Sequence, residues 1–324
     1  MRYRAVMIDE GYESYATESR LLAEIGCDFT ELPCANDPNR IAEAVADADA
    51  VLLREAPLPR AAIEGMSRGK VIVRYGAGVD NIDLVAARER GIKVANVPDY
   101  GVEEVSDQAL ALLMAVARRI STRDRDLRKG AWNVARQEPI YRLAGRRLGI
   151  CGYGRIGRAF HRKAAGLGFS RTIIHDPFLT VAPDGAELVS LDTLCRQSDI
   201  LSLHMPLTVE TRHMIDAERL AAMPRGAILI NVSRGGLVDE DALAVSLESG
   251  HLFGAGLDVF EQEPPNLSHP LFRQPTLVAS DHTGWYSEES VADLQSKAAE
   301  EIVRVLNGDE PENWVNRWTE STTS

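Results

Sequence analysis

Three polar residues in the last third of the chain have types suited to the reduction of a carbonyl group. They are Arg234 in the segment NVSRGG, Glu263 in DVFEQEP and His282 in ASDHTGW. A guanidinium can bind the carboxylate of a small acid through two hydrogen bonds, and an imidazole can give a proton to a carbonyl oxygen. A carboxylate on the other ring nitrogen would hold that imidazole in place. The set predicts proton transfer to a small 2-oxo acid, which also needs a hydride donor.

A glycine-rich segment has the pattern of a site for such a donor, a dinucleotide. It reads Gly152-Tyr153-Gly154-Arg155-Ile156-Gly157. The first glycine allows a tight turn, the second lets the backbone approach a pyrophosphate, and the third lets a helix pack against a strand. An apolar strand over 148–151 comes before it, and a helix over 158–167 and a strand over 172–175 come after it. The phosphates would bind at the amino end of the helix.

Asp176 directly follows the second of these strands, about 20 residues after the third glycine. A carboxylate at this point can accept hydrogen bonds from the ribose hydroxyls of an adenosine, and it repels a 2′-phosphate. The sequence therefore predicts NAD rather than NADP. The alternative is a glycine-rich turn followed by a solvated aspartate, which the order of strand, turn, helix and strand disfavours.

The composition is that of a globular protein with no strong affinity for nucleic acid. The chain has 324 residues, 45% of them hydrophobic and 26% charged, and a net charge of −12. This length favours two domains, and the negative charge argues against direct binding of nucleic acid. The four cysteines lack the spacing of metal ligands, so we expect no metal site and reduced thiols in a cytoplasmic protein. The start, MRYRAVMIDE, is typical of a strand rather than a signal peptide, and no apolar run is long enough to span a membrane.

Strand and helix patterns alternate along the chain and form two groups. Alternation of this kind is typical of α/β domains with doubly wound parallel sheets. Strands are expected over 3–8, 28–32, 50–53, 71–74 and 92–95 in the first group, and over 148–151, 172–175, 200–204, 227–232, 254–258 and 276–279 in the second. A long helix over 102–120 joins the groups, and a last helix over 288–306 is expected to return to the first. We predict one domain from 1–98 and 287–324, and another from 99–286.

Six ordered segments resemble the D-isomer-specific 2-hydroxyacid dehydrogenase family. They are VRYGAGVDNIDLVAARERGIKVANVP, GYGRIG, SDILSLHMPLT, NVSRGGLVDEDAL, GAGLDVFEQEP and the segment around His282. The resemblance implies a Rossmann NAD-binding domain inserted in a flavodoxin-like substrate domain, and NAD-dependent interconversion of a 2-oxo acid and a D-2-hydroxy acid. Within the family, the segments DYGVEEVSD, LDTLCRQSDILSLHMPLT and HTGWYSEES are most similar to the branch that contains the C-terminal-binding proteins.

The resemblance also implies a role for each matching residue. Arg234 would bind the substrate carboxylate and carbonyl, His282 would act as acid and base, and Glu263 would orient His282. The residues expected to bind substrate are Arg74, Tyr75, Gly76, Ala77, Gly78 and Trp285. Those expected to bind the cofactor are Gly152, Gly154, Arg155, Ile156, Gly157, Asp176, Pro206, Thr211, Val232, Arg234, Asp258 and His282.

Two aromatic residues give a hypothesis on substrate size. The indole of Trp285 and the ring of Tyr75 are expected to make one end of the substrate pocket apolar, which favours 2-oxo acids with longer side chains. The alternative is that Trp285 fills the hinge between the domains and Tyr75 packs in the core.

Other functions stay open at this point. The fold could serve as an NAD(H)-sensing scaffold, as in corepressors, or the same three polar residues could oxidise a small inorganic anion such as phosphite. The family usually has proline before the histidine, whereas Asp281 stands there in this chain. The apolar helix over 109–117 is expected to lie at an interface or in the core. The resemblance further implies a homodimer, because the corresponding region of the family is similar to a dimerisation element.

Overall fold

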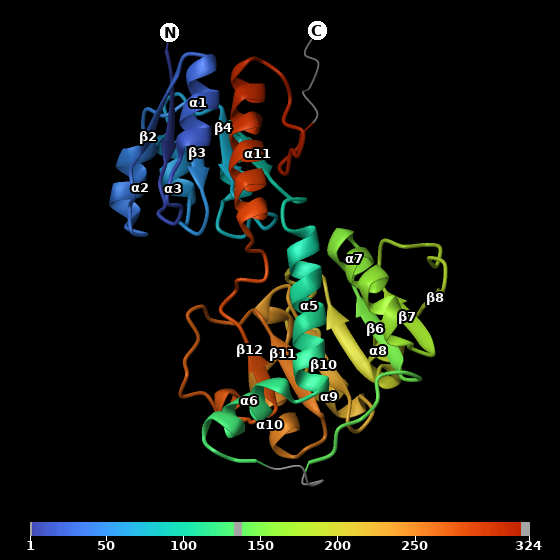
Figure 1. Ribbon diagram of the computed structural model, residues 1–324. Coiled ribbons are helices and arrows are strands. Elements are labelled where there is room, and N and C mark those ends of the chain that lie inside the picture. Colours follow the sequence, from blue (N-terminus) through green and yellow to red (C-terminus); the bar gives the residue numbers. More distant parts are fainter. Residues whose placement is uncertain (1, 133–137, 319–324) are drawn as a thin grey trace. The chain divides into compact units, whose positions relative to one another are not determined.

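Figure 1 shows the computed structural model, which describes residues 2–132 and 138–318. The chain divides into two compact units. Unit 1 consists of Met1–Gly101 and Ser287–Ser324, and unit 2 consists of Val102–Tyr286. The first division therefore falls three residues after the predicted boundary at 98, directly before the helix that opens unit 2.

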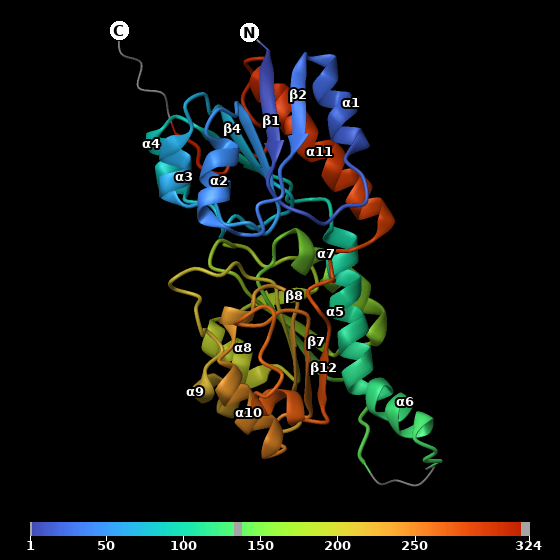
Figure 2. The same cartoon turned by 90° about the vertical axis from the view of Figure 1, so that its left-hand side faces the viewer.

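Unit 1 is a five-stranded parallel sheet in the order β2-β1-β3-β4-β5. Its strands are β1 (Tyr3–Met7), β2 (Cys27–Glu31), β3 (Ala50–Leu53), β4 (Val71–Arg74) and β5 (Lys93–Asn96). Its helices are α1 (Ala16–Glu24), α2 (Pro38–Val45), α3 (Arg60–Gly65), α4 (Leu84–Glu89) and α11 (Glu288–Leu306). Helices α1 and α11 cover one face of the sheet, and α2, α3 and α4 cover the other (Figures 1 and 2).

Local sequence explains how the elements of unit 1 begin and what they bury. All four residues of β3, Ala-Val-Leu-Leu, are buried, as expected for a central strand of a parallel sheet covered on both faces. Helix α2 starts with Asp37 as its cap and Pro38 in its first turn. Helix α11 starts with a reciprocal cap, in which Ser287 and Ser290 each accept the other's backbone N–H at 2.9 Å.

Unit 2 is a seven-stranded parallel sheet in the order β12-β11-β10-β9-β6-β7-β8. Its strands are β6 (Arg147–Cys151), β7 (Arg171–His175), β8 (Ala186–Leu188), β9 (Ile200–Leu203), β10 (Ile228–Asn231), β11 (Gly254–Leu257) and β12 (Leu277–Ala279). Its helices are α5 (Val102–Ala117), α6 (Ile120–Arg128), α7 (Arg155–Ala164), α8 (Leu191–Gln197), α9 (Ala217–Ala222) and α10 (Glu240–Glu248). Single 3₁₀ turns occur at Ala165–Leu167, Gly235–Leu237 and Pro270–Arg273.

Two apolar cores hold unit 2 together, one on each face of its sheet. One forms between the sheet and α5 and α7, around Leu113, Ile150 and Phe160. The other forms beneath α8, α9 and α10, around Leu201, Leu229 and Leu243. The two parallel sheets with helices on both faces confirm the predicted fold class.

The structure differs from the prediction in one helix, which is shorter than expected, and in one strand, which was not predicted. The helix expected over 102–120 ends at Ala117, and α6 starts separately at Ile120. Arg119 between them has a φ of 52°, a left-handed conformation that a continuing α-helix does not contain. Strand β8 was not expected from the sequence, because its three residues at the sheet edge lack an alternating apolar pattern.

In each sheet, chain order reverses direction at one pair of neighbouring strands. The pair is β1 and β3 in unit 1, and β6 and β9 in unit 2. Ligands of open α/β sheets bind beyond the carboxyl ends of the strands at such a point. The predicted functional residues should therefore lie in the loops that follow these strands. As for membranes, the described residues contain no helix long and apolar enough to span one.

Candidate active site

The glycine fingerprint of unit 2 forms the turn between β6 and α7, and two of its glycines cannot carry a side chain. Gly152 has a φ of 91°, and a Cβ on it would lie 2.6 Å from the carbonyl oxygen of His204. A Cβ on Gly157 would collide with the carbonyl oxygen of Gly152. The turn and the packing of α7 on the sheet thus require glycine at both places, as the sequence predicts.

Gly154 differs from these two because the space beside it is open. A Cβ on Gly154 would meet no atom within 4 Å. Helix α7 starts immediately after it, at Arg155, and no side chain caps the amino end of the helix. Backbone N–H groups at a helix start attract anions through their unused donors and the helix dipole. The open space and the uncapped helix therefore fit the pyrophosphate of a dinucleotide.

Asp176 lies directly after β7, and its carboxylate links the glycine turn after β6 to the segment after β7. Its Oδ2 accepts the backbone N–H of Tyr153 at 2.7 Å, and its Oδ1 accepts that of Phe178 at 2.9 Å. The carboxylate is therefore held at the carboxyl edge of the sheet, beside the fingerprint. Each oxygen keeps further acceptor capacity, which a ribose hydroxyl can use.

The other predicted cofactor residues follow the strands on the opposite side of the reversal point. Pro206 and Thr211 lie in the loop after β9, where the Thr211 hydroxyl donates to the carbonyl oxygen of Pro206 at 2.8 Å. Val232 follows β10, and its side chain is buried. The structure thus gathers residues from the loops after β6, β7, β9 and β10 at one edge of the sheet.

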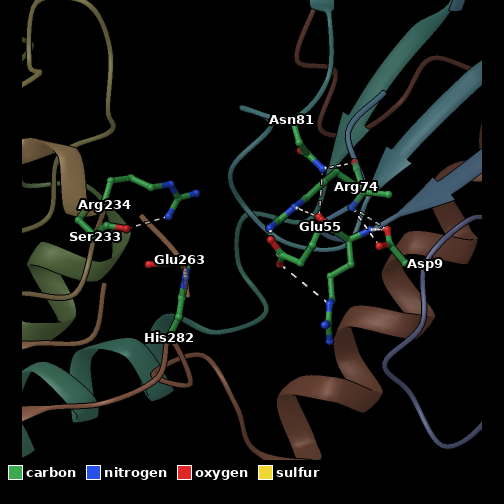
Figure 3. A network of polar contacts seen from close by, with 10 residues as sticks. Asp9, Glu55, Arg74, Asn81, Ser233, Arg234, Glu263 and His282 are labelled. Carbon is green, nitrogen blue, oxygen red and sulfur yellow. Dashed lines mark hydrogen bonds and ion pairs between the residues drawn. The ribbon is translucent and has the colours of Figure 1, made fainter. Parts of the chain in front are cut away.

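His282 and Glu263 form a hydrogen-bonded pair in unit 2. The Nδ1 of His282 lies 2.6 Å from Oε2 of Glu263 (Figure 3). Oε1 of Glu263 accepts the backbone N–H of Phe260 at 2.9 Å. Burial raises the pKa of Glu263, but the hydrogen bonds from His282 and Phe260 and the charge of Arg234 outweigh it and lower that pKa overall. Glu263 thus stays a carboxylate, and Nε2 is the nitrogen of His282 that can meet a reacting oxygen.

Arg234 is placed by the short turn after β10. Its Nη1 donates to the carbonyl oxygen of Ser233 at 2.8 Å (Figure 3). Its own carbonyl oxygen accepts the side-chain amide of Asn231 at 2.8 Å. Gly235 follows, and any Cβ there would collide with the backbone of Phe260. This close approach brings the turn of Arg234 against the segment that leads to Glu263.

Asp258 lies after β11 and holds the loop that carries His282. Its side chain is buried, with Oδ1 accepting the hydroxyl of Ser280 at 2.6 Å and Oδ2 accepting the N–H of Gly284 at 3.0 Å. Its carbonyl oxygen accepts the N–H of His282 at 2.9 Å. Burial raises the pKa of Asp258, which hydrogen bonds and the nearby His282 partly offset.

Asp281, which stands where the family usually has proline, lies at the exposed side of this loop. Its Oδ1 accepts the hydroxyl of Thr283 at 2.8 Å. The neighbouring His282 has a φ of 57°, and proline at position 281 is not needed for this conformation.

In unit 1, Arg74 ends β4 and lies in a polar cluster at the carboxyl edge of the sheet. Its Nε donates to the carbonyl oxygen of Arg54 at 3.1 Å, and its Nη2 lies 3.3 Å from Oε1 of Glu55 (Figure 3). Asp9, after β1, accepts the N–H of Arg54 at 2.6 Å, and Asn81 donates to the carbonyl oxygen of Arg54 at 3.2 Å. Asp9, Glu55 and Asn81 were not predicted to lie in this cluster, because no local pattern in the sequence marks them.

The segment after Arg74 contains the remaining residues expected to bind substrate in unit 1. Gly76 has a φ of 124°, and its position leaves no room for a Cβ beside the guanidinium of Arg74. The carbonyl oxygen of Ala77 accepts a hydrogen bond of 2.6 Å from the side-chain amide of Asn96. Gly78 follows in the same bend. The segment is thus a backbone loop folded closely around Arg74.

The buried position of Tyr75 contradicts its part in the hypothesis on substrate size. Its side chain is 1% exposed, its hydroxyl donates to Oε1 of Glu18 at 2.7 Å, and its ring packs edge-on against Tyr12. The ring therefore belongs to the core of unit 1 and does not line a pocket. Trp285 in unit 2 is half-buried and packs edge-on against Tyr286, with ring centroids 5.7 Å apart.

Comparison with known proteins places the chain in a family. Residues 110–284 match the family model described as D-isomer specific 2-hydroxyacid dehydrogenase, NAD binding domain. The chain is 41% identical to a glyoxylate reductase of Korarchaeum cryptofilum, over 86% of this chain and 85% of that protein. It is 38% identical to a D-3-phosphoglycerate dehydrogenase of Methanocaldococcus jannaschii, over 92% of this chain but only 57% of that longer protein.

A solved structure agrees over nearly the whole fold. The crystal structure of a protein from Thermus thermophilus matches with a TM-score of 0.88 and 37% identity, covering 96% of this chain and 99% of the other. These matches confirm the family and the cofactor predicted from the sequence, while the placement in the branch of the C-terminal-binding proteins stays a prediction. The chain belongs to the D-isomer specific 2-hydroxyacid dehydrogenase family and is an NAD-dependent oxidoreductase.

Proposed function

We propose that the enzyme interconverts a small 2-oxo acid and the corresponding D-2-hydroxy acid, with His282 as the acid and base. The observation that carries this proposal is the 2.6 Å hydrogen bond between Nδ1 of His282 and Glu263, next to the charge of Arg234. An imidazole held by a carboxylate, together with a guanidinium, supplies the proton donor and the cation that a 2-oxo acid requires.

In the reductive direction, each residue has one task. NADH, when bound, supplies the hydride that the carbonyl carbon takes up. Nε2 of His282 gives its proton to the carbonyl oxygen, so that the product is an alcohol, and in the oxidative direction the same nitrogen removes that proton. Glu263 accepts the hydrogen bond from Nδ1–H, which fixes the tautomer and orientation of the ring. Arg234 binds the substrate carboxylate and the carbonyl oxygen.

The cofactor residues are proposed from the carboxyl edge of the unit 2 sheet. Gly152 and Gly157 shape the turn, Gly154 leaves open space beside it, and Arg155 and Ile156 offer their N–H groups to the pyrophosphate at the start of α7. Asp176 accepts hydrogen bonds from the adenosine ribose. Pro206, Thr211, Val232, Arg234, Asp258 and His282 are proposed to contact the nicotinamide half.

Unit 1 is proposed to contribute further substrate contacts. Arg74 offers a cation, and the backbone N–H groups of the segment from Tyr75 to Gly78 offer neutral donors to an anionic group. Glu55 already pairs with Arg74, so a substrate anion at Arg74 has to share this cation with a carboxylate. Trp285 is proposed to contact the substrate side chain.

Oxidation of NADH by a panel of 2-oxo acids tests the function. The panel includes glyoxylate, 2-oxobutyrate, 2-oxo-4-methylthiobutyrate and 3-phosphohydroxypyruvate, and the products are identified by chiral chromatography. We expect turnover with at least one of them and a D-2-hydroxy acid as product. An enzyme that binds NADH but turns over none would support the scaffold function instead, and NAD reduction by phosphite alone would support oxidation of an inorganic anion.

We further propose a cytoplasmic homodimer. Helix α6 buries none of its residues in the single chain, and Ile120 and Leu127 on it are 55% and 53% exposed. Apolar side chains exposed together on one helix are typical of an interface. Light scattering after size-exclusion chromatography gives the mass directly, and a monomer would contradict this proposal.

A further inference from the structure

The loop from Ser280 to Gly284 is attached to Asp258 at three places. The Ser280 hydroxyl and the Gly284 N–H donate to the two carboxylate oxygens of Asp258, and the His282 N–H donates to its carbonyl oxygen. A Cβ on Gly284 would lie 2.6 Å from Oδ2 of Asp258, so any larger residue there would displace this carboxylate. His282 is thus centred in a loop whose two ends bind the same buried carboxylate.

The backbone of His282 needs this support. Its φ of 57° lies in the left-handed region, which residues other than glycine rarely adopt. Such a conformation persists only where several independent contacts with the surrounding structure hold the residue in it. The hydrogen bonds of Ser280 and Gly284 to Asp258 provide these contacts for the backbone, and Glu263 separately holds the imidazole.

A side chain from α5 extends the same chain of hydrogen bonds. Nε2 of Gln108 donates to the Ser280 hydroxyl at 2.8 Å, and that hydroxyl donates in turn to Asp258. The Gln108 side chain also lies close to Gly284, since a Cβ on this glycine would come within 2.9 Å of its Cγ. The amide of Gln108 therefore directs the Ser280 hydroxyl, because an oxygen that accepts from one partner is turned to donate to the other.

We propose that Ser280 and Gln108 are positioning residues, which hold the His282 loop on Asp258 and so aim the imidazole at the substrate. This inference rests on the proposed function of His282 as the acid and base. Neither residue is a catalytic residue, because both act through Asp258 and the loop backbone. All of the groups involved lie within unit 2.

Replacement of Ser280 gives the first test. Ser280→Ala removes both hydrogen bonds of the hydroxyl, and we expect kcat for the reduction to fall about tenfold or more, since small displacements of a reacting group are costly. The dissociation constant for NADH, measured by fluorescence titration, should change little. Ser280→Thr keeps a hydroxyl at a half-buried position and should restore most of kcat.

Replacement of Gln108 tests whether the two residues act in one chain. Gln108→Met keeps the length of the side chain and removes the amide donor, so we expect a smaller loss of kcat than for Ser280→Ala. In the double variant Ser280→Ala with Gln108→Met, the second change should add nothing, because Gln108 acts through the missing hydroxyl. Residues that share one network are non-additive in this way, whereas independent residues add.

A buried serine elsewhere in unit 2 provides the control. The hydroxyl of Ser246 on α10 is buried and has no hydrogen-bond partner in the described part of the chain, so Ser246→Ala should keep the wild-type kcat. A wild-type kcat in Ser280→Ala would overturn the inference, and so would a kcat in Ser280→Thr as low as that in Ser280→Ala. Fully additive losses in the double variant would also overturn it. If His282→Ala also keeps full turnover, the proposed function itself fails, which is a different result.

Discussion

The hydroxyl of Tyr75, the residue that follows Arg74, donates a hydrogen bond of 2.7 Å to the buried carboxylate of Glu18. Glu18 is fully buried, and its other oxygen lies 3.3 Å from the side-chain amide of Gln295 on α11. The pair thus joins three elements of unit 1: α1, the end of β4 and α11. Burial raises the pKa of Glu18, although its hydrogen bonds oppose the shift.

Stability should therefore depend on pH through Glu18. The pKa of this carboxyl is higher in the folded than in the unfolded chain. Its contribution to the free energy of unfolding is therefore complete below the unfolded pKa and is lost as the pH rises through the folded pKa. Glu18→Gln keeps an acceptor for Tyr75 without a charge, so we expect its melting temperature to fall less than that of the wild type as the pH rises. Glu300→Gln, an exposed change on α11, is the control. Parallel pH profiles for wild type and Glu18→Gln would contradict this account.

Removal of the imidazole should abolish most of the turnover and spare the cofactor. We expect His282→Ala to lower kcat by roughly 10²–10⁴-fold, the usual value of a positioned acid and base. The affinity for NADH should change far less, because most of the proposed cofactor contacts are made by other residues. Single-turnover measurement on a substrate for which chemistry is rate-limiting is the appropriate assay. Wild-type turnover in this variant would show that another group transfers the proton.

Glu263 should set the acidic limit of activity. The hydrogen bonds from His282 and Phe260 outweigh burial and lower the pKa of Glu263, so it remains a carboxylate at pH values where an ordinary glutamate is already protonated. As the pH falls through this lowered pKa, the carboxylate and its hold on His282 are lost. Glu263→Gln should lower kcat and remove this acidic decline from the profile of kcat against pH. An unchanged profile in the variant would assign the decline to another group.

The enzyme should discriminate strongly against NADPH. Asp176 lies at the end of β7, where a 2′-phosphate would meet its carboxylate. Each factor of ten in discrimination corresponds to about 1.4 kcal/mol. We expect NADH to exceed NADPH by about two decades in kcat/KM, and Asp176→Ser to reduce that ratio. Equal efficiencies in the wild type would contradict the role of Asp176.

Trp285 should favour substrates with longer side chains. An indole in contact with the substrate rewards burial of aliphatic or thioether groups by about 25 cal/mol per Å². We expect 2-oxo acids of four or more carbons to be reduced with higher kcat/KM than glyoxylate, and Trp285→Ala to remove much of this preference. Because the ring of Tyr75 is buried in the core, Tyr75→Phe should leave the selectivity unchanged. A preference for glyoxylate, or a selectivity that Trp285→Ala does not alter, would leave Trp285 with the role of filling the hinge.

Local patterns in the sequence were sufficient for every described strand except β8, and for the fingerprint. Runs such as Ala50–Leu53 and Ile228–Asn231 are apolar throughout because the central strands of a parallel sheet are covered on both faces. The glycines at 152 and 157 are dictated by a turn of a few residues and by the helix that follows it, whereas Gly154 leaves open space beside the start of that helix. Once the strand order is known, the loops after β6, β7, β10 and β12 must lie at one edge, so a site with His282 could be predicted.

Tertiary structure alone decided which side chains hold this site together. Gln108 and Ser280 are 172 positions apart, and nothing in either segment indicates a hydrogen bond between them. Tyr75 was expected in a pocket, yet the packing of α1 and α11 beneath the sheet encloses its ring and gives its hydroxyl to Glu18. Strands and turns follow from interactions between near neighbours in the chain, whereas buried polar partners depend on how distant elements pack, which a single sequence does not encode in any local pattern.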